Sequence, residues 1–116
     1  MSNVFTTQGY DGRNLGVSQP VGSSVTGSPL TTSGASVALG PFTSGMIYVT
    51  TETATCHILF SKDPNAAATT SNMKLGGVLA NETYTYQFAV DSGDYLHVIQ
   101  GSGAGTVYVE QARTNL

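Results

Sequence analysis

The chain has 116 residues, about the size of one domain, and only 9% of them are charged, with a formal net charge of −3. Its basic residues cannot form the stripe that neutralises nucleic-acid phosphates, because there are four and they are scattered: Arg13, Lys62, Lys74 and Arg113. No apolar run approaches the roughly 20 residues of a membrane span, and the first residues lack the pattern of a signal peptide. We therefore expect a protein made in a cytoplasm, with no nucleic-acid and no membrane partner.

Residues 1–34 are predicted to form an extended N-terminal arm. This stretch is rich in Gly, Ser and Thr, and its apolar residues are isolated, without a period that would bury a core. A disordered tail is the alternative, but isolated aromatic and apolar residues are typical anchors of protein–protein contacts. The arm residues expected at an interface are Val4, Phe5, Tyr10, Arg13, Leu15 and Val17.

Residues 35–116 are predicted to form an all-β antiparallel domain, a β-sandwich or a barrel. Short stretches rich in β-branched and aromatic residues begin mostly about 8–12 residues apart, the spacing typical of sandwiches and barrels. These predicted strands are 35–40, 46–51, 55–61, 84–90, 95–100 and 106–112. In 84–90, Tyr84, Tyr86, Phe88 and Val90 alternate with Thr, Gln and Ala, which predicts one buried and one solvated face.

The connections between the predicted strands carry turn residues. Pro64 presets φ in a turn, and 91–94 is a tight turn with a glycine. The glycine-rich stretch 101–105 is predicted to be a hairpin loop between the last two strands, and it does not fit a phosphate-binding loop because no helix follows it. The long connection 64–83 is expected to hold one helical turn in its Ala-rich middle and a short edge strand at Met73 and Leu75.

The residue types that active sites use are predicted to be structural, so we expect no enzyme, no catalytic residue, no metal and no cofactor. Cys56 and His57 are adjacent in a strand and point to opposite faces, whereas Cys56 shares a face with Ile58 and Phe60 and is predicted to lie in the core. A pair of Cys56 with His97 across strands is left open. So is a metal site at the two histidines, although no dense cluster supplies further ligands.

From residue 35 to 112 the chain resembles a group of small structural proteins of tailed bacteriophages. The shared pattern is a Cys-His strand, a Pro-Asn loop, a Met-x-Leu step, an aromatic strand, a Gly-Asp turn, a Val-Ile-Gln strand and a Gly-rich connection into a Val-x-Val strand. In this chain these features are Cys56 and His57, Pro64 and Asn65, Met73 and Leu75, 86–88, Gly93 and Asp94, 98–100, and 105–109.

The resemblance implies a capsid cement or decoration protein, with a jelly-roll-like sandwich that is often a homotrimer. Such a protein lies on the outer surface of the virion, binds the major capsid protein and stabilises contacts between shell subunits. Residues 1–34 lie outside the resemblance, so whether the arm contacts capsid or sister subunits is left open, and its deletion is expected to leave the sandwich folded. The alternatives are a tail or head-fibre component and a carbohydrate-binding module, although the chain has no Trp.

Overall fold

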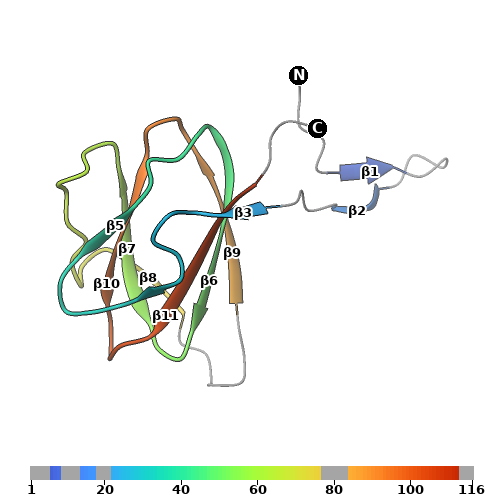
Figure 1. Ribbon diagram of the computed structural model, residues 1–116. Helices are drawn as coiled ribbons and strands as arrows, with labels where there is room; N and C mark the ends of the chain where they lie inside the picture. Colours follow the sequence, from blue (N-terminus) through green and yellow to red (C-terminus); the bar gives the residue numbers. More distant parts are fainter. Residues whose placement is uncertain (1–5, 9–13, 18–21, 77–83, 113–116) are drawn as a thin grey trace.

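The computed structural model describes residues 6–8, 14–17, 22–76 and 84–112, and within these ranges it contains eleven strands and no helix. Every strand pair is antiparallel, so the predicted all-β antiparallel fold is confirmed. Nine strands form two facing sheets, a β-sandwich (Figure 1). The other two, β1 (Thr6–Gln8) and β2 (Asn14–Val17), pair with each other.

The two sheets of the sandwich have different sizes. The smaller sheet has the order β5 (Val37–Leu39), β10 (Tyr95–Gln100), β7 (Cys56–Ser61) and β8 (Met73–Leu75). The larger sheet has the order β3 (Gly22–Ser24), β11 (Thr106–Ala112), β6 (Gly45–Glu52) and β9 (Tyr84–Val90), and β4 (Leu30–Thr31) also pairs with β11. All six strands predicted from the sequence are present, and the expected edge strand at Met73 and Leu75 is β8.

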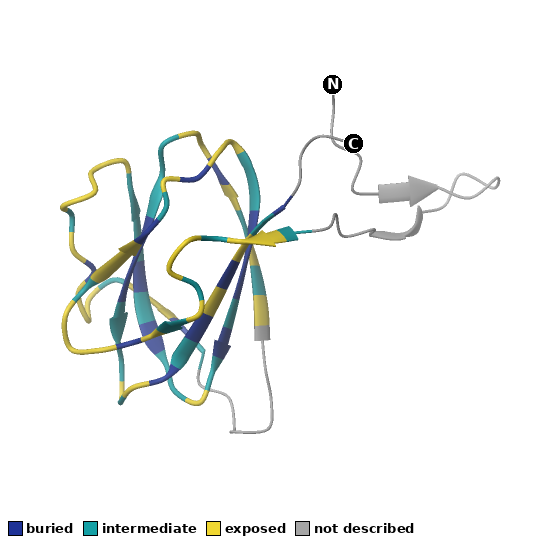
Figure 2. Ribbon diagram, in the orientation of Figure 1, coloured by how far each residue is buried: buried dark blue, intermediate teal, exposed yellow. Residues whose placement is uncertain are grey.

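The core lies between the sheets and is built from alternate residues of the strands. In the pairing of β7 with β10, Ile58 lies opposite Val98 and is buried with it. The larger sheet contributes β-branched residues at alternate positions of β6 and β11, which are Ile47, Val49, Val107 and Val109. Figure 2 shows these buried positions along the strands, with exposed residues concentrated in the connections. Burial of this apolar surface, at roughly 25 cal/mol per Å², is the main stabilising contribution.

Residues 22–34 belong to the sandwich. Both β3 and β4 pair with β11, and Val25 and Leu30 pack against the core. The boundary predicted at residue 34 therefore lies inside the sandwich, and deletion of 1–34 would remove two strands from the larger sheet. Short strands rich in Gly and Ser carry too few apolar residues to show an alternating pattern, which is why the sequence does not distinguish them from an arm.

Two predicted connections are wrong and two are confirmed. The stretch 101–105 is not a hairpin loop, because β10 belongs to the smaller sheet and β11 to the larger one. The Ala-rich part of 62–72 contains no helical turn. The proline turn is confirmed, with the main-chain N–H of Ala66 donating to the carbonyl of Asp63 at 3.2 Å. The tight turn 91–94 is closed by the N–H of Asp94, which donates to the carbonyl of Asp91 at 3.1 Å.

Candidate functional site

The arm residues predicted at an interface fall into two groups. Leu15 and Val17 lie on β2, whose main chain is in register with β1, with Val17 opposite Thr6. The other four lie outside the described residues: Val4, Phe5, Tyr10 and Arg13. A role for these six residues at an interface therefore remains a prediction.

The thiol of Cys56 lies in the core. Cys56 is fully buried opposite Leu75 of β8, and this burial raises the pKa of the thiol to about 11. The core position predicted for it is confirmed. Pairing with His97 is excluded, because Cys56 lies on the inner face opposite Gln100, whereas His97 lies opposite Leu59 on the outer face.

Both histidines lie on the outer face of the smaller sheet, on neighbouring strands. His57 is held by the carbonyl of Asn72, 2.9 Å from its Nδ1, and this contact places the segment 62–72 over the outer face. The same segment reaches the start of β5, where the N–H of the buried Ala68 donates to Oγ of Ser36 at 2.9 Å. His97 is only 1% exposed, and within the described residues neither of its ring nitrogens has a hydrogen-bond partner. Searched over those residues, the structure gathers no group of three metal-ligating side chains here or elsewhere.

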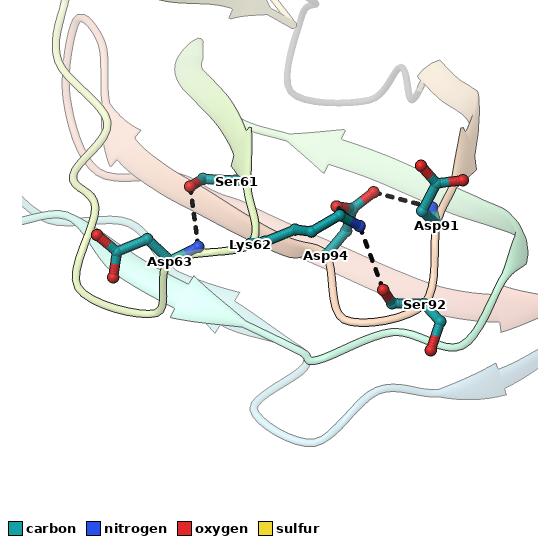
Figure 3. Close-up of polar contacts among 6 residues, drawn as sticks. All are labelled: Ser61, Lys62, Asp63, Asp91, Ser92 and Asp94. Carbon is teal, nitrogen blue, oxygen red and sulfur yellow. Dashed lines mark hydrogen bonds and ion pairs between the residues drawn. The ribbon is translucent and has the colours of Figure 1, made fainter.

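A lysine ties the end of β7 to the turn between β9 and β10 (Figure 3). Nζ of Lys62 lies 3.0 Å from Oδ1 of Asp94 and donates to the carbonyl of Ser92 at 3.2 Å. Oδ2 of Asp94 accepts from the N–H of Asp91 at 2.8 Å. This N–H and the Lys62 ammonium hold the pKa of the Asp94 carboxyl below its usual value. One carboxylate oxygen of Asp94 binds Lys62 and the other binds the N–H of Asp91, so the group acts as a structural tie.

One side of the sandwich is closed by an apolar border, which we define as Phe60, Met73, Tyr86 and Phe88. Phe60 and Phe88 come from opposite sheets, and their ring centroids are 5.1 Å apart. Tyr86 lies beside Phe88, and its hydroxyl accepts a hydrogen bond from the N–H of Gly76 at 3.0 Å. The aromatic residues are half-buried, and Met73 is 55% exposed. The border therefore leaves apolar surface in contact with solvent.

Beside this border, β9 is the last strand in the order of the larger sheet. It pairs with β6 in seven consecutive residue pairs, and with no other strand in the described part of the chain. The alternation predicted for it is confirmed, with residues 85, 87 and 89 exposed and 86, 88 and 90 half-buried or buried. The strand contains no charge, glycine or proline, the features that protect edge strands from pairing.

A groove of about 340 Å³ lies next to the opposite edge, between β3 and the segment 40–43. Its walls include the side chains of Ser24, Thr26, Phe42 and Thr43, of which Phe42 is buried. The sequence does not reveal the groove because its walls come from separate parts of the chain. Serine and threonine residues line part of it, and among the described residues that line it none is charged.

Comparison of the chain with protein-family models, with curated proteins and with solved structures finds no match. In the ranges that the structure describes, no helix is long and apolar enough to cross a membrane.

Proposed function

We propose that the protein is a virion structural protein that binds the outside of a tailed-phage capsid and stabilises contacts between shell subunits. The major capsid protein is its partner in this proposal, and the chain self-associates as a homotrimer on the capsid surface. No catalytic residue or cofactor is part of the proposed role.

The observation that carries this proposal is the place of the resembling residues in the fold. Cys56 and His57 begin β7, Met73 and Leu75 form β8, 86–88 is the centre of β9, and 98–100 and 105–109 lie at β10 and β11. The Pro-Asn and Gly-Asp pairs form the turns after β7 and before β10. The resemblance therefore follows the sandwich itself rather than a run of exposed loops.

Two physical features support a role in assembly. The apolar border and the uncharged edge of β9 leave surface that association would bury. A lattice that displays many copies also converts weak single contacts into strong overall binding. A small sandwich with these properties gains stability when it docks on a repeating shell.

The proposal is tested by the copy number of the chain in purified particles from its source, measured by quantitative mass spectrometry against the major shell protein. A copy number comparable with that of the shell protein is expected. A handful of copies would assign the chain to a tail or fibre instead, and its absence from particles would overturn the virion role.

A further inference from the structure

The outer face of the larger sheet carries an exposed tyrosine between two glutamates. Paired residues of neighbouring strands point to the same face, and the pair Val49 and Val109 is buried in the core. Tyr108 and Glu110, on either side of Val109 in β11, therefore point outwards, and both are exposed. Glu52, at the end of β6, lies on the same face, where the Tyr108 hydroxyl donates to its Oε1 at 3.2 Å.

Neither glutamate has a cationic partner among the described residues. The structure shows no ion pair to Glu52 or to Glu110 there. The described basic residues, Lys62 and Lys74, lie after β7 and on β8, which belong to the smaller sheet. The ring of Tyr108 therefore has unpaired negative charge on two sides. Glu52 contacts its hydroxyl, and the Cα of Glu110 lies two residues along the strand, roughly 7 Å away.

A buried hydroxyl without a partner lies on the same face. Tyr48 pairs with Glu110 of β11 on one side and with Gln87 of β9 on the other. It is 8% exposed, and its hydroxyl has no hydrogen-bond partner among the described residues. Burial, and after it the charge of Glu110, raises the pKa of this hydroxyl. Buried hydroxyls are normally hydrogen-bonded, so this one has a free bond to offer to a group that docks on the face.

We propose that this face docks a partner protein through an arginine, whose guanidinium lies on the Tyr108 ring and pairs with Glu52 or Glu110. A guanidinium is attracted to the negative face of an aromatic ring and stacks on it. It also pairs with a carboxylate through two parallel hydrogen bonds. Charge complementarity of this kind selects a basic partner and disfavours an acidic one. The inference specifies the chemistry of the partner alone, so it stands or falls separately from the proposed binding to a capsid.

The extent of the face favours a polypeptide over a free small cation. Beyond β6 the exposed surface continues onto β9, where Thr85 and Gln87 are exposed. The hydroxyl of Thr85 lies 3.1 Å from that of Thr50 on β6, so polar groups join the strands across the face. A small cation on such a surface would be covered from one side only. A polypeptide that covers the surrounding polar groups keeps water from the charges, and this exclusion strengthens their attraction.

The test measures binding of a synthetic peptide of alternating arginine and glycine to the full chain, by NMR chemical-shift titration at low ionic strength. Glu52→Gln with Glu110→Gln removes both charges from the face and keeps side chains that accept hydrogen bonds. The control, Asp63→Asn with Asp91→Asn, removes the same charge from exposed positions outside the larger sheet. Thermal melts check that each variant folds.

The unmodified chain is expected to bind the peptide with shift changes concentrated in β6 and β11, and the control to bind within about twofold of it. The double glutamine variant should bind about tenfold more weakly. Tyr108→Leu should weaken binding by about threefold, whereas Tyr108→Phe, which keeps the ring, should retain it.

An unmodified chain that does not bind the peptide would overturn the proposal. Equal weakening in the glutamine variant and in the control would overturn it too, because net charge alone would then hold the peptide. If the glutamine variant does not fold, the unmodified chain decides. Its shift changes must centre on the amides of Glu52, Tyr108 and Glu110, and changes centred on the smaller sheet would overturn the proposal.

Discussion

Thr32 and Gly105, which lie 73 positions apart in the chain, are joined by hydrogen bonds that use both the main chain and the Thr32 side chain. The N–H of Thr32 donates to the carbonyl of Gly105 at 2.8 Å, and the N–H of Gly105 donates to Oγ1 of Thr32 at 2.9 Å. The Thr32 hydroxyl also lies 3.3 Å from the Gly105 carbonyl, to which it donates. Both residues are buried, so this contact seals the start of β11 against the segment after β4.

Thr32→Val is expected to lower the free energy of unfolding by about 1–3 kcal/mol, because the buried N–H of Gly105 loses its acceptor. Thr31→Val, at an exposed position of β4, is the control and should change stability by less than about 0.5 kcal/mol. Urea denaturation of both variants measures the difference. Equal effects at the two positions would contradict the role assigned to the Thr32 hydroxyl.

The glycines of the 101–105 connection are expected to differ in their tolerance of alanine. A Cβ at Gly105 would lie 2.9 Å from the carbonyl oxygen of Glu52, and one at Gly101 would lie 2.9 Å from that of Thr55. A Cβ at Gly103 meets nothing within 4 Å. Gly101→Ala and Gly105→Ala should each destabilise the protein by about 1–3 kcal/mol through overpacking.

Gly103→Ala is the matched control for this loop and should leave the thermal midpoint nearly unchanged. If all three alanine variants had the same thermal midpoint as the unmodified protein, close packing of the connection against residues 52–55 would not be the reason for its glycines.

The two histidines are expected to respond in opposite directions to the same substitution. His97→Leu should raise stability by about 1 kcal/mol, because it removes a buried polar ring without a partner among the described residues. His57→Leu should lower stability by about the same amount, because it breaks the hydrogen bond with the Asn72 carbonyl. Urea denaturation at pH 8 measures both changes, and a loss of stability in His97→Leu would contradict this view of the ring.

The tie between Lys62 and Asp94 is expected to contribute to acid sensitivity. The folded protein lowers the pKa of Asp94, so the contribution is complete above the unfolded pKa of about 3.9 and is lost as the pH falls through the lower folded pKa. Asp94→Asn should therefore destabilise the protein near pH 6 and make little difference near pH 2.

Asp91→Asn is the control for this prediction, because Asp91 contributes its main-chain N–H to the turn. Thermal melts of both variants across this pH range test the assignment. A constant difference between Asp94→Asn and the unmodified protein at every pH would show that the carboxylate charge is not responsible.

The local pattern of residues was enough to predict the strands from β5 to β11, because the period of two depends on each strand burying one face. It placed Cys56 in the core and predicted the turns at Pro64 and Gly93. For residues 84–90, the sequence predicted a strand with aromatic residues but did not indicate that this strand lies at the edge of its sheet. A strand in which apolar and polar residues alternate shows the same pattern whether it pairs with one neighbouring strand or with two.

Tertiary structure alone decided which sheet each strand joins, because that choice depends on contacts between residues far apart in the chain. The turn at 91–94 and the connection 101–105 are short enough for hairpins, yet both cross between sheets. His97 is buried although it lies on the outer face of the smaller sheet, the face on which the segment 62–72 contacts His57. Whether residues 22–34 belong to the sandwich depends on β11, which lies more than 70 residues later in the chain. This strand supplies the hydrogen bonds that the two short, weakly apolar strands β3 and β4 need.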